Sequence, residues 1–584
     1  MVNKRDNLEN IIKSYGAVPS RQQIEYQKEE LSAFIHFGIN TFMDREWGTG
    51  DEDPIIFNPT KLNTDQWIET LKESGFKRVI LTAKHHDGFC LWNSRYTSHN
   101  ISRSYWKNGN GDIVDEMSKS CRKYGVKFAV YLSPWDENSK YYGKGQEYNE
   151  YYMNQLTELL SNYGEISEVW MDGAKGSNVE QDYNFEDWFR LIKKYHKDCI
   201  IFSPHGPDIR WIGNEQGYAG EPCWSTIDIE KMKVSVSQEY LNTGMENGRN
   251  WVIGECDVSI RPGWFYHESQ DLEVKSLEKL LDIYFNSVGR NAILLLNVPP
   301  TKEGLIHEND INRIKEFGNA IKSIFENNLA LNSKVFSSSI LNNLSEFDCS
   351  NVIDENYETY WAPNKYDCNQ YIEIEFKNKI EFDVICIQEF IALGQRVAEF
   401  NIEALVCNEW KRIFEGKTIG YKRLVRLESV CSDKIRINFV RSLDIPLINN
   451  LGIYKQSKKL EVKKTNTLEE SKKETIGFKK TSYEVKESSK EVVLKVVRSG
   501  EAKTKLDVDY STFSGTAING LNYQPWSGNL VFNVGEVEKT ISVSIIDSNM
   551  ISESKYFYVR LEDSLDLGIL NKNKEAIIKI TKSI

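Results

Sequence analysis

The chain of 584 residues carries a net charge of −12, and 40% of its residues are hydrophobic. This length is too great for one domain, so we expect three or four domains with cores of their own. The acidic excess argues against nucleic acid or an anionic membrane as the main partner. No apolar run approaches the ~20 residues that span a bilayer, so we expect no membrane span.

Residues 1–330 alternate predicted strands with amphipathic helices. The predicted strands are 31–37, 78–83, 127–132, 168–172, 199–203, 251–255 and 292–297, and the predicted helices are 67–75, 113–124, 148–163, 187–196, 276–287 and 309–324. This alternation predicts parallel strands with crossover helices, and the length suits a (β/α)8 barrel. The sixth strand is poorly marked between residues 215 and 250, so we expect an irregular barrel there.

Past residue 330 the pattern changes to short strands at close spacing, which predicts all-β sandwiches. Residues 331–456 form the first sandwich, with strands expected at 371–376, 384–389, 398–405 and 434–439. Residues 457–476 are rich in Lys, Glu, Ser and Thr and are typical of a linker. Residues 477–584 again show short alternating strands, so the sequence predicts a barrel followed by two β-domains.

The ten cysteines and the first ten residues bear on the compartment. The cysteines are scattered, with no C-x-x-C pair or metal-like Cys/His cluster, so we expect free thiols and no metal site. Residues 1–10 are polar and charged, unlike a secretory signal peptide. The sequence therefore leaves two locations open: the cytoplasm, or a secreted or cell-surface protein whose leader is absent from this chain.

Polar side chains recur where the barrel strands are expected to end. They are His36, Glu46, Trp47, His85, His86, Tyr131 and Asp172. Each has a plainer explanation, because Asp172 could cap a turn, a lone His is often a core residue, and paired His can bind metal. In a barrel, however, strand ends meet at the catalytic face. Neutral hydrogen-bonding groups, an aromatic ring and a carboxylate together favour a monosaccharide pocket, which the 12% of aromatic residues also suits.

Cleavage of a sugar would need two carboxyl groups, one that attacks or activates water and one that protonates the leaving oxygen. Asp172 ends the apolar strand Val169-Trp170-Met171, and Gly173 allows a sharp turn behind it. The candidates for the second group are Asp208, Glu215, Glu221, Glu255 and Asp257. Spacing alone does not choose between Glu215 and Glu255.

Residues 30 to about 330 resemble the α-L-fucosidases of glycoside hydrolase family 29. The matching segments are FIHFGINTF (34–42), REWGTG (45–50), ILTAKHHDGFCLW (80–92), VYLSPW (130–135) and EVWMDGAKG (168–176). The resemblance implies a retaining exo-enzyme that requires no cofactor and acts on fucosylated oligosaccharides and glycoconjugates. Its nucleophile maps onto Asp172.

The segment RWIGNEQG (210–217) is similar to the branch that acts on α-1,3/1,4-linked fucose in Lewis-type glycans, where the acid/base maps onto Glu215. The resemblance implies that the fucose pocket consists of His36, Glu46, Trp47, His85, His86, Tyr131, Trp264, which faces the fucose methyl, and Arg210, which contacts the sugar. The alternatives are a transfucosidase, a broad-specificity α-L-fucosidase and a non-catalytic glycan-binding protein. The oligomeric state stays open.

The two β-regions also resemble known modules. Residues 331–456 are similar to the galactose-binding-like sandwich that follows the barrel in this branch, and residues 477–584 are similar to a Calx-β domain. Some Calx-β domains bind Ca²⁺ through acid clusters, but here only Asp547 and Glu553 are candidates and Lys555 lies nearby. We therefore expect a spacer or adhesion module, with a structural Ca²⁺ left open. Substrates of the host-glycan type and the appended β-domains favour export of this protein from the cell.

Overall fold

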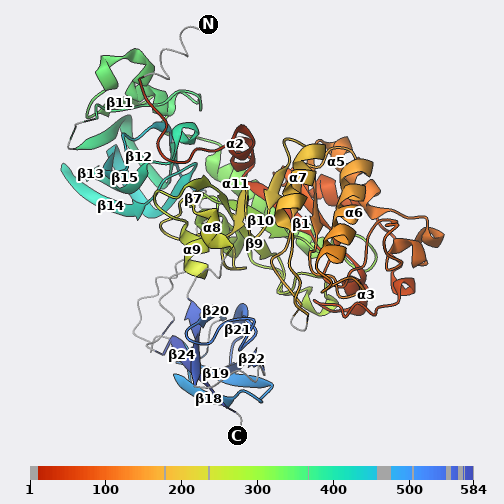
Figure 1. The fold of residues 1–584 in the computed structure, drawn as a ribbon. Helices are drawn as coiled ribbons and strands as arrows, with labels where there is room; N and C mark the ends of the chain where they lie inside the picture. The colour runs from red at the N-terminus through yellow and green to blue at the C-terminus, as the bar shows by residue number, and fades with distance from the viewer. Residues whose placement is uncertain are drawn as a thin grey trace. The chain divides into compact units, whose positions relative to one another are not determined.

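The computed structural model describes residues 11–176, 179–233, 237–365, 367, 369–456, 475–500, 502, 505–546, 554–562, 570 and 573–582. The chain divides into two compact units, Met1–Val462 and Lys463–Ile584 (Figure 1). Most of the expected linker lies outside the described residues. Its last two residues, 475 and 476, belong to strand β17 (Thr475–Phe478).

A closed barrel of eight parallel strands organises the first unit, in the order β1-β10-β9-β6-β5-β4-β3-β2. The strands are β1 (Leu31–Ile35), β2 (Arg78–Lys84), β3 (Lys127–Leu132), β4 (Glu168–Trp170), β5 (Ile200–Phe202), β6 (Ile209–Trp211), β9 (Ile253–Ser259) and β10 (Ile293–Asn297). Nearly every strand residue is buried, because side chains fill the inside and helices cover the outside. The predicted barrel is confirmed.

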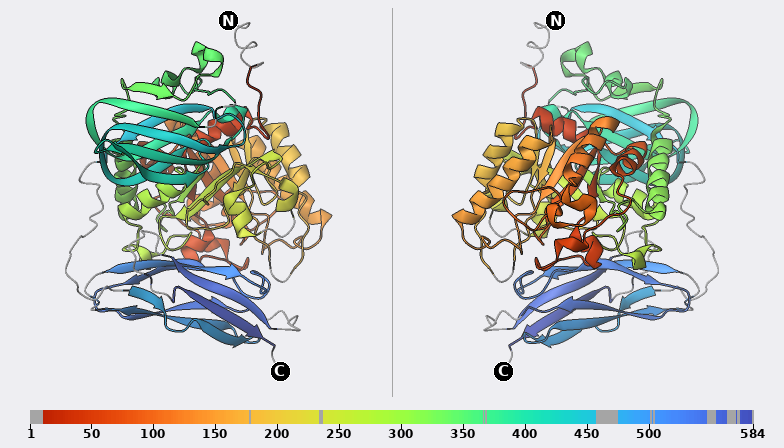
Figure 2. Two further views of the ribbon diagram at one scale, coloured as in Figure 1. Left: turned by 90° about the vertical axis from the view of Figure 1, so that its left-hand side faces the viewer. Right: turned by 90° about the vertical axis from the view of Figure 1, so that its right-hand side faces the viewer.

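Long helices lie around the barrel strands, as the two side views in Figure 2 show. They are α4 (Thr64–Glu73), α5 (Ile113–Tyr124), α6 (Gln146–Asn162), α7 (Phe185–Tyr195), α10 (Leu277–Asn286) and α11 (Glu308–Phe325). Five of the six begin where a capping side chain accepts a hydrogen bond from a backbone N–H of the first turn, at Asn63, Asp112, Asn184, Ser276 and His307. Such caps satisfy donors that the helix itself leaves unpaired, which fixes where each helix starts.

The barrel is irregular between strands β5 and β9. Strand β6 pairs with β5 at Phe202 and Ile209, directly after the turn 203–208 and without a crossover helix. The prediction that the sixth strand lies between residues 215 and 250 was therefore wrong, because this strand is β6, at residues 209–211. That stretch holds the two-stranded ribbon of β7 (Thr226–Ile227) and β8 (Asn250–Trp251), with α8 (Ile229–Met232) and α9 (Gln238–Thr243) between them.

An antiparallel β-region follows α11 in the same unit. Its strands are β11 (Lys334–Ser337), β12 (Gln370–Glu389), β13 (Val397–Val406), β14 (Glu409–Lys417), β15 (Arg423–Ser442) and β16 (Ile448–Tyr454). The ladder between β12 and β15 shifts register twice, and such irregularities bend long strands. Trp361 is fully buried in the core of this region, so it packs the fold.

The second unit consists of two packed sheets. One has the order β17-β19-β22 and the other β18-β24-β23-β20-β21. Besides β17, the strands are β18 (Ser482–Lys486), β19 (Glu491–Ser499), β20 (Leu506–Ser514), β21 (Ser527–Phe532), β22 (Glu538–Ser544), β23 (Lys555–Glu562) and β24 (Glu575–Thr581). Buried and exposed residues alternate along β19, which is the pattern of a strand with one face in a core.

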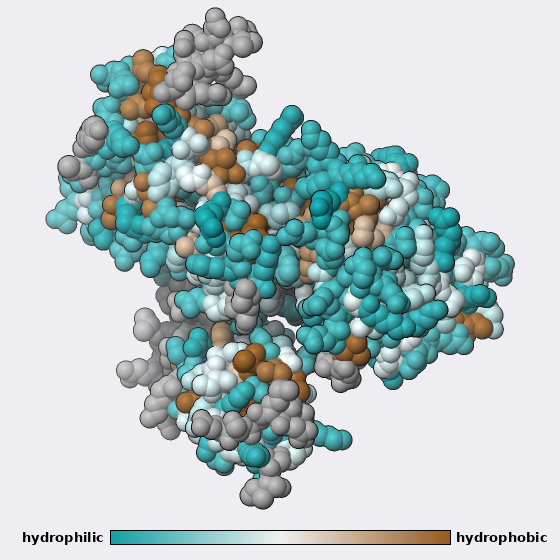
Figure 3. Space-filling model, in the orientation of Figure 1, coloured by the Kyte–Doolittle hydropathy of each residue, from teal (hydrophilic) through white to brown (hydrophobic). Residues whose placement is uncertain are grey.

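Hydrophilic residues cover most of the face in Figure 3, and hydrophobic residues appear on it only in small groups. Among the described residues, no helix combines the length and the apolar character needed to cross a bilayer.

Candidate active site

Four barrel strands bring polar side chains to one rim of the barrel. His36 follows β1, His86 follows β2, Tyr131 lies near the end of β3, and Asp172 follows β4. Tyr131 Oη donates to Asp172 Oδ2 at 3.1 Å, and His86 Nε2 lies 3.8 Å from the same oxygen. The rings of His85 and His86 are 4.2 Å apart between centroids. The carboxyl ends of these parallel strands therefore gather the residues predicted from the sequence.

Asp172 is held in place but remains reachable. Its side chain is 26% exposed. Oδ1 accepts a hydrogen bond from the Ala174 backbone N–H at 2.8 Å, in the turn that follows the strand. Oδ2 faces Tyr131 and His86, so both carboxylate oxygens have fixed directions. A carboxylate with a fixed direction and access to solvent can attack a bound substrate.

His36 presents a hydrogen-bond acceptor to the site, because Asn297 determines its tautomer. The Asn297 amide nitrogen donates to Ser259 Oγ at 2.9 Å and to the Trp264 backbone carbonyl at 2.8 Å. Its oxygen must therefore be the atom that lies 2.8 Å from His36 Nδ1. Nδ1 carries the proton, which leaves Nε2 as an acceptor.

The same argument assigns the two neighbouring histidines. Ser133 donates its hydroxyl proton to the Trp135 carbonyl at 2.6 Å, so it accepts from His86 Nδ1 at 2.7 Å, and His86 Nε2 is an acceptor. The Asn40 amide donates to the Glu46 carbonyl, and the same nitrogen lies 3.4 Å from His85 Nδ1. His85 Nδ1 therefore accepts, and Nε2 carries the proton.

All three imidazoles are neutral near pH 7. Burial lowers the pKa of His36 to about 4, against smaller opposing effects of Asn297, Glu46 and Asp172. Burial also lowers the pKa of His85 far below its ordinary value and lowers that of His86. The site thus offers two neutral acceptors and one neutral donor. Such a set matches sugar hydroxyl groups, each of which can donate and accept one hydrogen bond.

Aromatic rings flank these imidazoles. The Trp264 ring lies 5.1 Å from that of His36, and the Trp135 ring stacks 4.7 Å from that of His86. Trp47 is 51% exposed and lies 6.0 Å from Trp135. Trp135 was not among the predicted site residues, although it follows β3 within a segment that carried the family resemblance. The sequence signal that could have identified Trp135 as a site residue is its position three residues after the end of β3.

Glu46 holds the Trp264 segment. Its Oε2 accepts from the Trp264 backbone N–H at 2.7 Å, and its Oε1 accepts from Phe265 N–H at 3.2 Å. His267 Nε2 lies 2.6 Å from Oε1, and the hydrogen bond to Glu46 raises the pKa of His267. Both oxygens of Glu46 are therefore engaged in fixing Trp264 beside the pocket.

Glu215 lies on the loop after β6 and has a raised pKa. Its side chain is accessible to solvent, and Oε2 accepts from Trp264 Nε1 at 3.3 Å. The surrounding protein displaces water from the carboxyl group and raises its pKa to about 7, with the negative charges of Asp172 and Glu46 adding to the effect and the Trp264 bond opposing it. Glu215 thus keeps a proton near neutral pH, as a general acid must.

The other candidates for the second carboxyl group have different surroundings. Burial also raises the pKa of Glu255 to about 7, but Glu255 accepts from Tyr26 Oη and from Trp170 Nε1 in a fully buried site. Tyr26 precedes β1, so this site faces the opposite end of the barrel. Three further acids are engaged elsewhere: Asp208 with Lys193, Glu221 with Arg423, and the buried Asp257 with the Trp211 indole N–H. Geometry therefore favours Glu215.

Arg210 does not reach the pocket, contrary to the expectation from the sequence. It is fully buried, and its guanidinium donates to the backbone carbonyls of Leu241 at 2.9 Å, Trp224 at 2.7 Å and Val252. Ile209 and Trp211, its neighbours on β6, belong to the core inside the barrel. Side chains alternate along a strand, so Arg210 points out of the barrel. Its role is to tie loops together.

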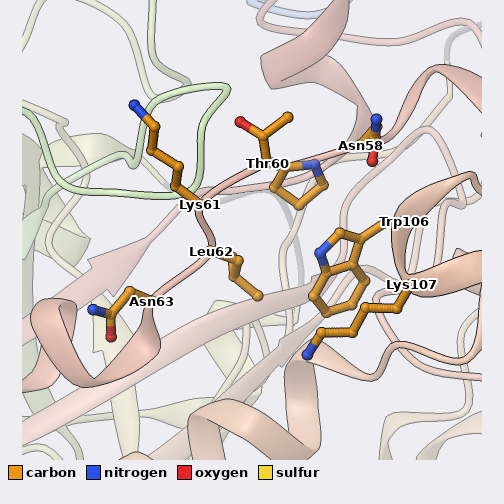
Figure 4. A pocket seen from close by; sticks show the side chains of 8 residues that line it. Asn58, Thr60, Lys61, Leu62, Asn63, Trp106 and Lys107 are labelled. Atoms are coloured by element: carbon orange, nitrogen blue, oxygen red, sulfur yellow. The ribbon is translucent and has the colours of Figure 1, made fainter.

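The described residues form no metal centre, and a further hollow among them has no catalytic carboxyl groups. No group of three His, Cys, Asp or Glu within the described ranges has the geometry to hold a metal ion. The acids that the Ca²⁺ prediction used, Asp547 and Glu553, lie outside those ranges. A hollow of about 540 Å³ is formed by residues 58–63 with Trp106 and Lys107 (Figure 4). No Asp or Glu lines it, so it lacks the carboxyl pair that glycoside hydrolysis needs.

Comparisons with known proteins identify the family to which the chain belongs. Residues 21–324 match the family model described as Alpha-L-fucosidase, and residues 469–582 match that of the Calx-beta domain. The chain is 48% identical to Alpha-L-fucosidase 1 of Arabidopsis thaliana over 443 residues, which are 75% of this chain and 87% of that relative.

Solved structures with this fold include a Ruminococcus gnavus family 29 fucosidase in complex with fucose, at 39% identity and a TM-score of 0.72 over 76% of this chain and 96% of that one. A glycoside hydrolase 29 family member from an unknown rumen bacterium covers 97% of this chain and 100% of its own, at 32% identity and a TM-score of 0.70. The chain belongs to the α-L-fucosidases of glycoside hydrolase family 29 and carries a Calx-beta domain.

Proposed function

We propose that the protein is a retaining exo-α-L-fucosidase in which Asp172 is the nucleophile and Glu215 the acid/base. The observation that carries the proposal is the pairing of an oriented carboxylate, Asp172, with a carboxyl group of pKa about 7, Glu215, at the same barrel rim. Double displacement needs one ionised and one protonated carboxyl group in the same site.

In the first step, Asp172 attacks the anomeric carbon of fucose while Glu215 gives its proton to the departing glycosidic oxygen. The bond between carbon and leaving oxygen breaks, and a covalent fucosyl–Asp172 ester forms. In the second step, Glu215 takes a proton from water, and the resulting hydroxide displaces Asp172. L-Fucose leaves with its original configuration, and both carboxyl groups return to their starting states. The mechanism requires about 5–5.5 Å between the two carboxyl groups in the complex.

Azide rescue tests the assignment of Glu215. In Glu215→Ala, an aryl fucoside with a good leaving group still forms the ester, because that step needs little acid assistance. Azide then displaces Asp172 without a general base, so turnover should rise and fucosyl azide should accumulate. If azide restores Glu255→Ala but leaves Glu215→Ala unchanged, the acid/base assignment is wrong.

For the substrate, we propose terminal α-1,3- and α-1,4-linked fucose on branched, Lewis-type glycans. The support is the segment RWIGNEQG (210–217), which carries Glu215 and resembles the branch of the family that acts on these linkages. A panel of α-1,2, α-1,3 and α-1,4 fucosides with a simple aryl fucoside tests this proposal. High activity on the α-1,2 and aryl substrates would contradict it. Product analysis at high acceptor concentration separates hydrolysis from transfucosylation.

A further inference from the structure

The loop that carries Glu215 runs from the end of β6 at Trp211 to the start of β7 at Thr226. Near its beginning, Asn214 closes a turn around Glu215. The Asn214 amide nitrogen donates to the Tyr218 carbonyl at 2.9 Å, and its oxygen accepts from the Gln216 N–H at 3.1 Å. The turn fixes the local conformation around Glu215. The position of this turn relative to the barrel depends on the contacts that hold the rest of the loop.

The far end of this loop is held by the β-sandwich that follows the barrel. Gln395 Oε1 accepts from the Ser225 backbone N–H at 2.8 Å, and Gln395 Nε2 donates to the Cys223 carbonyl at 3.1 Å. Thr418 Oγ1 accepts from the Cys223 N–H at 2.9 Å. Gln395 and Thr418 are 3% and 2% exposed, so these bonds are sheltered from water. Three backbone groups of the loop thus bond to two sandwich side chains, and the barrel residue Asn291 also donates to the Cys223 carbonyl, at 3.1 Å.

A third sandwich residue holds the middle of the loop. Arg423, at the start of β15, donates to Glu221 Oε1 at 2.7 Å, and the Lys417 backbone N–H donates to the same oxygen at 3.2 Å. From the barrel side, Arg290 donates to the Ala219 carbonyl at 3.0 Å. The segment 219–225 is therefore clamped between barrel and sandwich, only a few residues from Glu215.

We propose that Gln395, Thr418 and Arg423 are positioning residues for the catalytic acid, so that the sandwich completes the active site without touching the sugar. The inference rests on the proposed role of Glu215. A general acid must stay within hydrogen-bond reach of the leaving oxygen, and a misplacement of 1 Å can cost ~100-fold in rate. Releasing the clamp lets the loop move, which takes Glu215 away from Trp264 Nε1.

The clamp predicts an effect that general destabilisation does not. An acid that is out of place slows the departure of poor leaving groups and hardly affects good ones. We would therefore measure kcat/KM for a series of aryl fucosides with phenols of different pKa, because kcat/KM reports the step in which the phenol leaves. Wild-type enzyme should show a shallow dependence on the phenol pKa. In Gln395→Leu, the poorest leaving group should lose about tenfold or more and the best less than about threefold.

Lys422→Met is the matched control. Lys422 is also a sandwich residue that contacts the barrel, and its half-buried side chain forms an ion pair with Glu30 but does not bond to segment 219–225. We expect both variants to lower the melting temperature, while only Gln395→Leu steepens the dependence on leaving group. Thr418→Val provides a second test of the clamp if Gln395→Leu does not fold.

Glu215→Ala, measured in parallel, separates the two levels of the proposal. A steep dependence for Glu215→Ala and Gln395→Leu, with a shallow one for Lys422→Met, supports the clamp. If Glu215→Ala is steep while Gln395→Leu and Thr418→Val resemble Lys422→Met, the sandwich does not position the acid, and the assignment of Glu215 stands. A shallow dependence for Glu215→Ala would overturn both proposals.

Discussion

The hydrogen bond between Trp264 and Glu215 gives a quantitative prediction. Trp264→Phe removes the indole N–H that donates a hydrogen bond to Glu215 Oε2 at 3.3 Å, and it keeps an aromatic ring beside His36. The bond favours the ionised carboxylate, so without it the pKa of Glu215 should rise above its value of about 7. A hydrogen bond contributes ~0.5–1.5 kcal/mol. Since one pKa unit corresponds to ~1.4 kcal/mol, the expected rise is about 0.5–1 unit.

The assay is the pH profile of kcat/KM, which reports the ionisation of groups in the free enzyme. Glu215 must be protonated to donate, so kcat/KM falls as the pH rises through its pKa. The descending limb should therefore move to higher pH in Trp264→Phe, whatever the change in absolute rate. Trp47→Phe is the control, because Trp47 is exposed and no described bond joins it to Glu215. A limb that stays in place or moves to lower pH in Trp264→Phe would refute the reasoning.

Three further substitutions test other parts of the site. Asp172→Asn should abolish turnover without changing the circular dichroism spectrum, and substantial residual activity would exclude Asp172 as the nucleophile. Asn297→Asp should raise the pKa of His36 by about 1–3 units from about 4, because a carboxylate replaces the amide beside Nδ1. Its protonated form loses the Nε2 acceptor, so the acidic limb of kcat/KM should move towards neutral pH; an unmoved limb would speak against the tautomer assignment. Arg210→Met should destabilise the fold by about 3 kcal/mol or more in urea unfolding, because three backbone carbonyls lose their donor. KM should stay unchanged, and a large rise in KM would show that Arg210 contacts the substrate.

Much of the barrel could be predicted because its strands are buried on both sides and its helices carry clear signals. The segment 113–124 was predicted as a helix and forms α5 with the same bounds, where Asp112 caps the first turn. Strand β6 was missed because it has only three residues and no crossover helix before it. A strand this short is defined by its neighbours in the barrel, and the sequence does not contain that information locally.

Some residues of the candidate site could likewise be predicted from the sequence and others could not. Strand-end positions and the family resemblance identified the residues that now lie together, such as Asp172 and His86. The error at Arg210 arose because local sequence does not say which face of a short strand a side chain occupies. Asn297, which orients His36 from 261 positions away, was missed for a related reason. It ends the apolar run of β10, and a polar residue at that place was the only local signal.

The stereochemistry of hydrolysis tests the central claim most directly. Proton NMR of the sugar released in the first minutes distinguishes α-L-fucose from β-L-fucose before mutarotation mixes them. Attack by Asp172 followed by attack of water inverts the anomeric carbon twice, so the account predicts α-L-fucose as the first product from an α-L-fucoside. Initial release of β-L-fucose would show a single displacement by water and would contradict the assignment of Asp172 as the nucleophile.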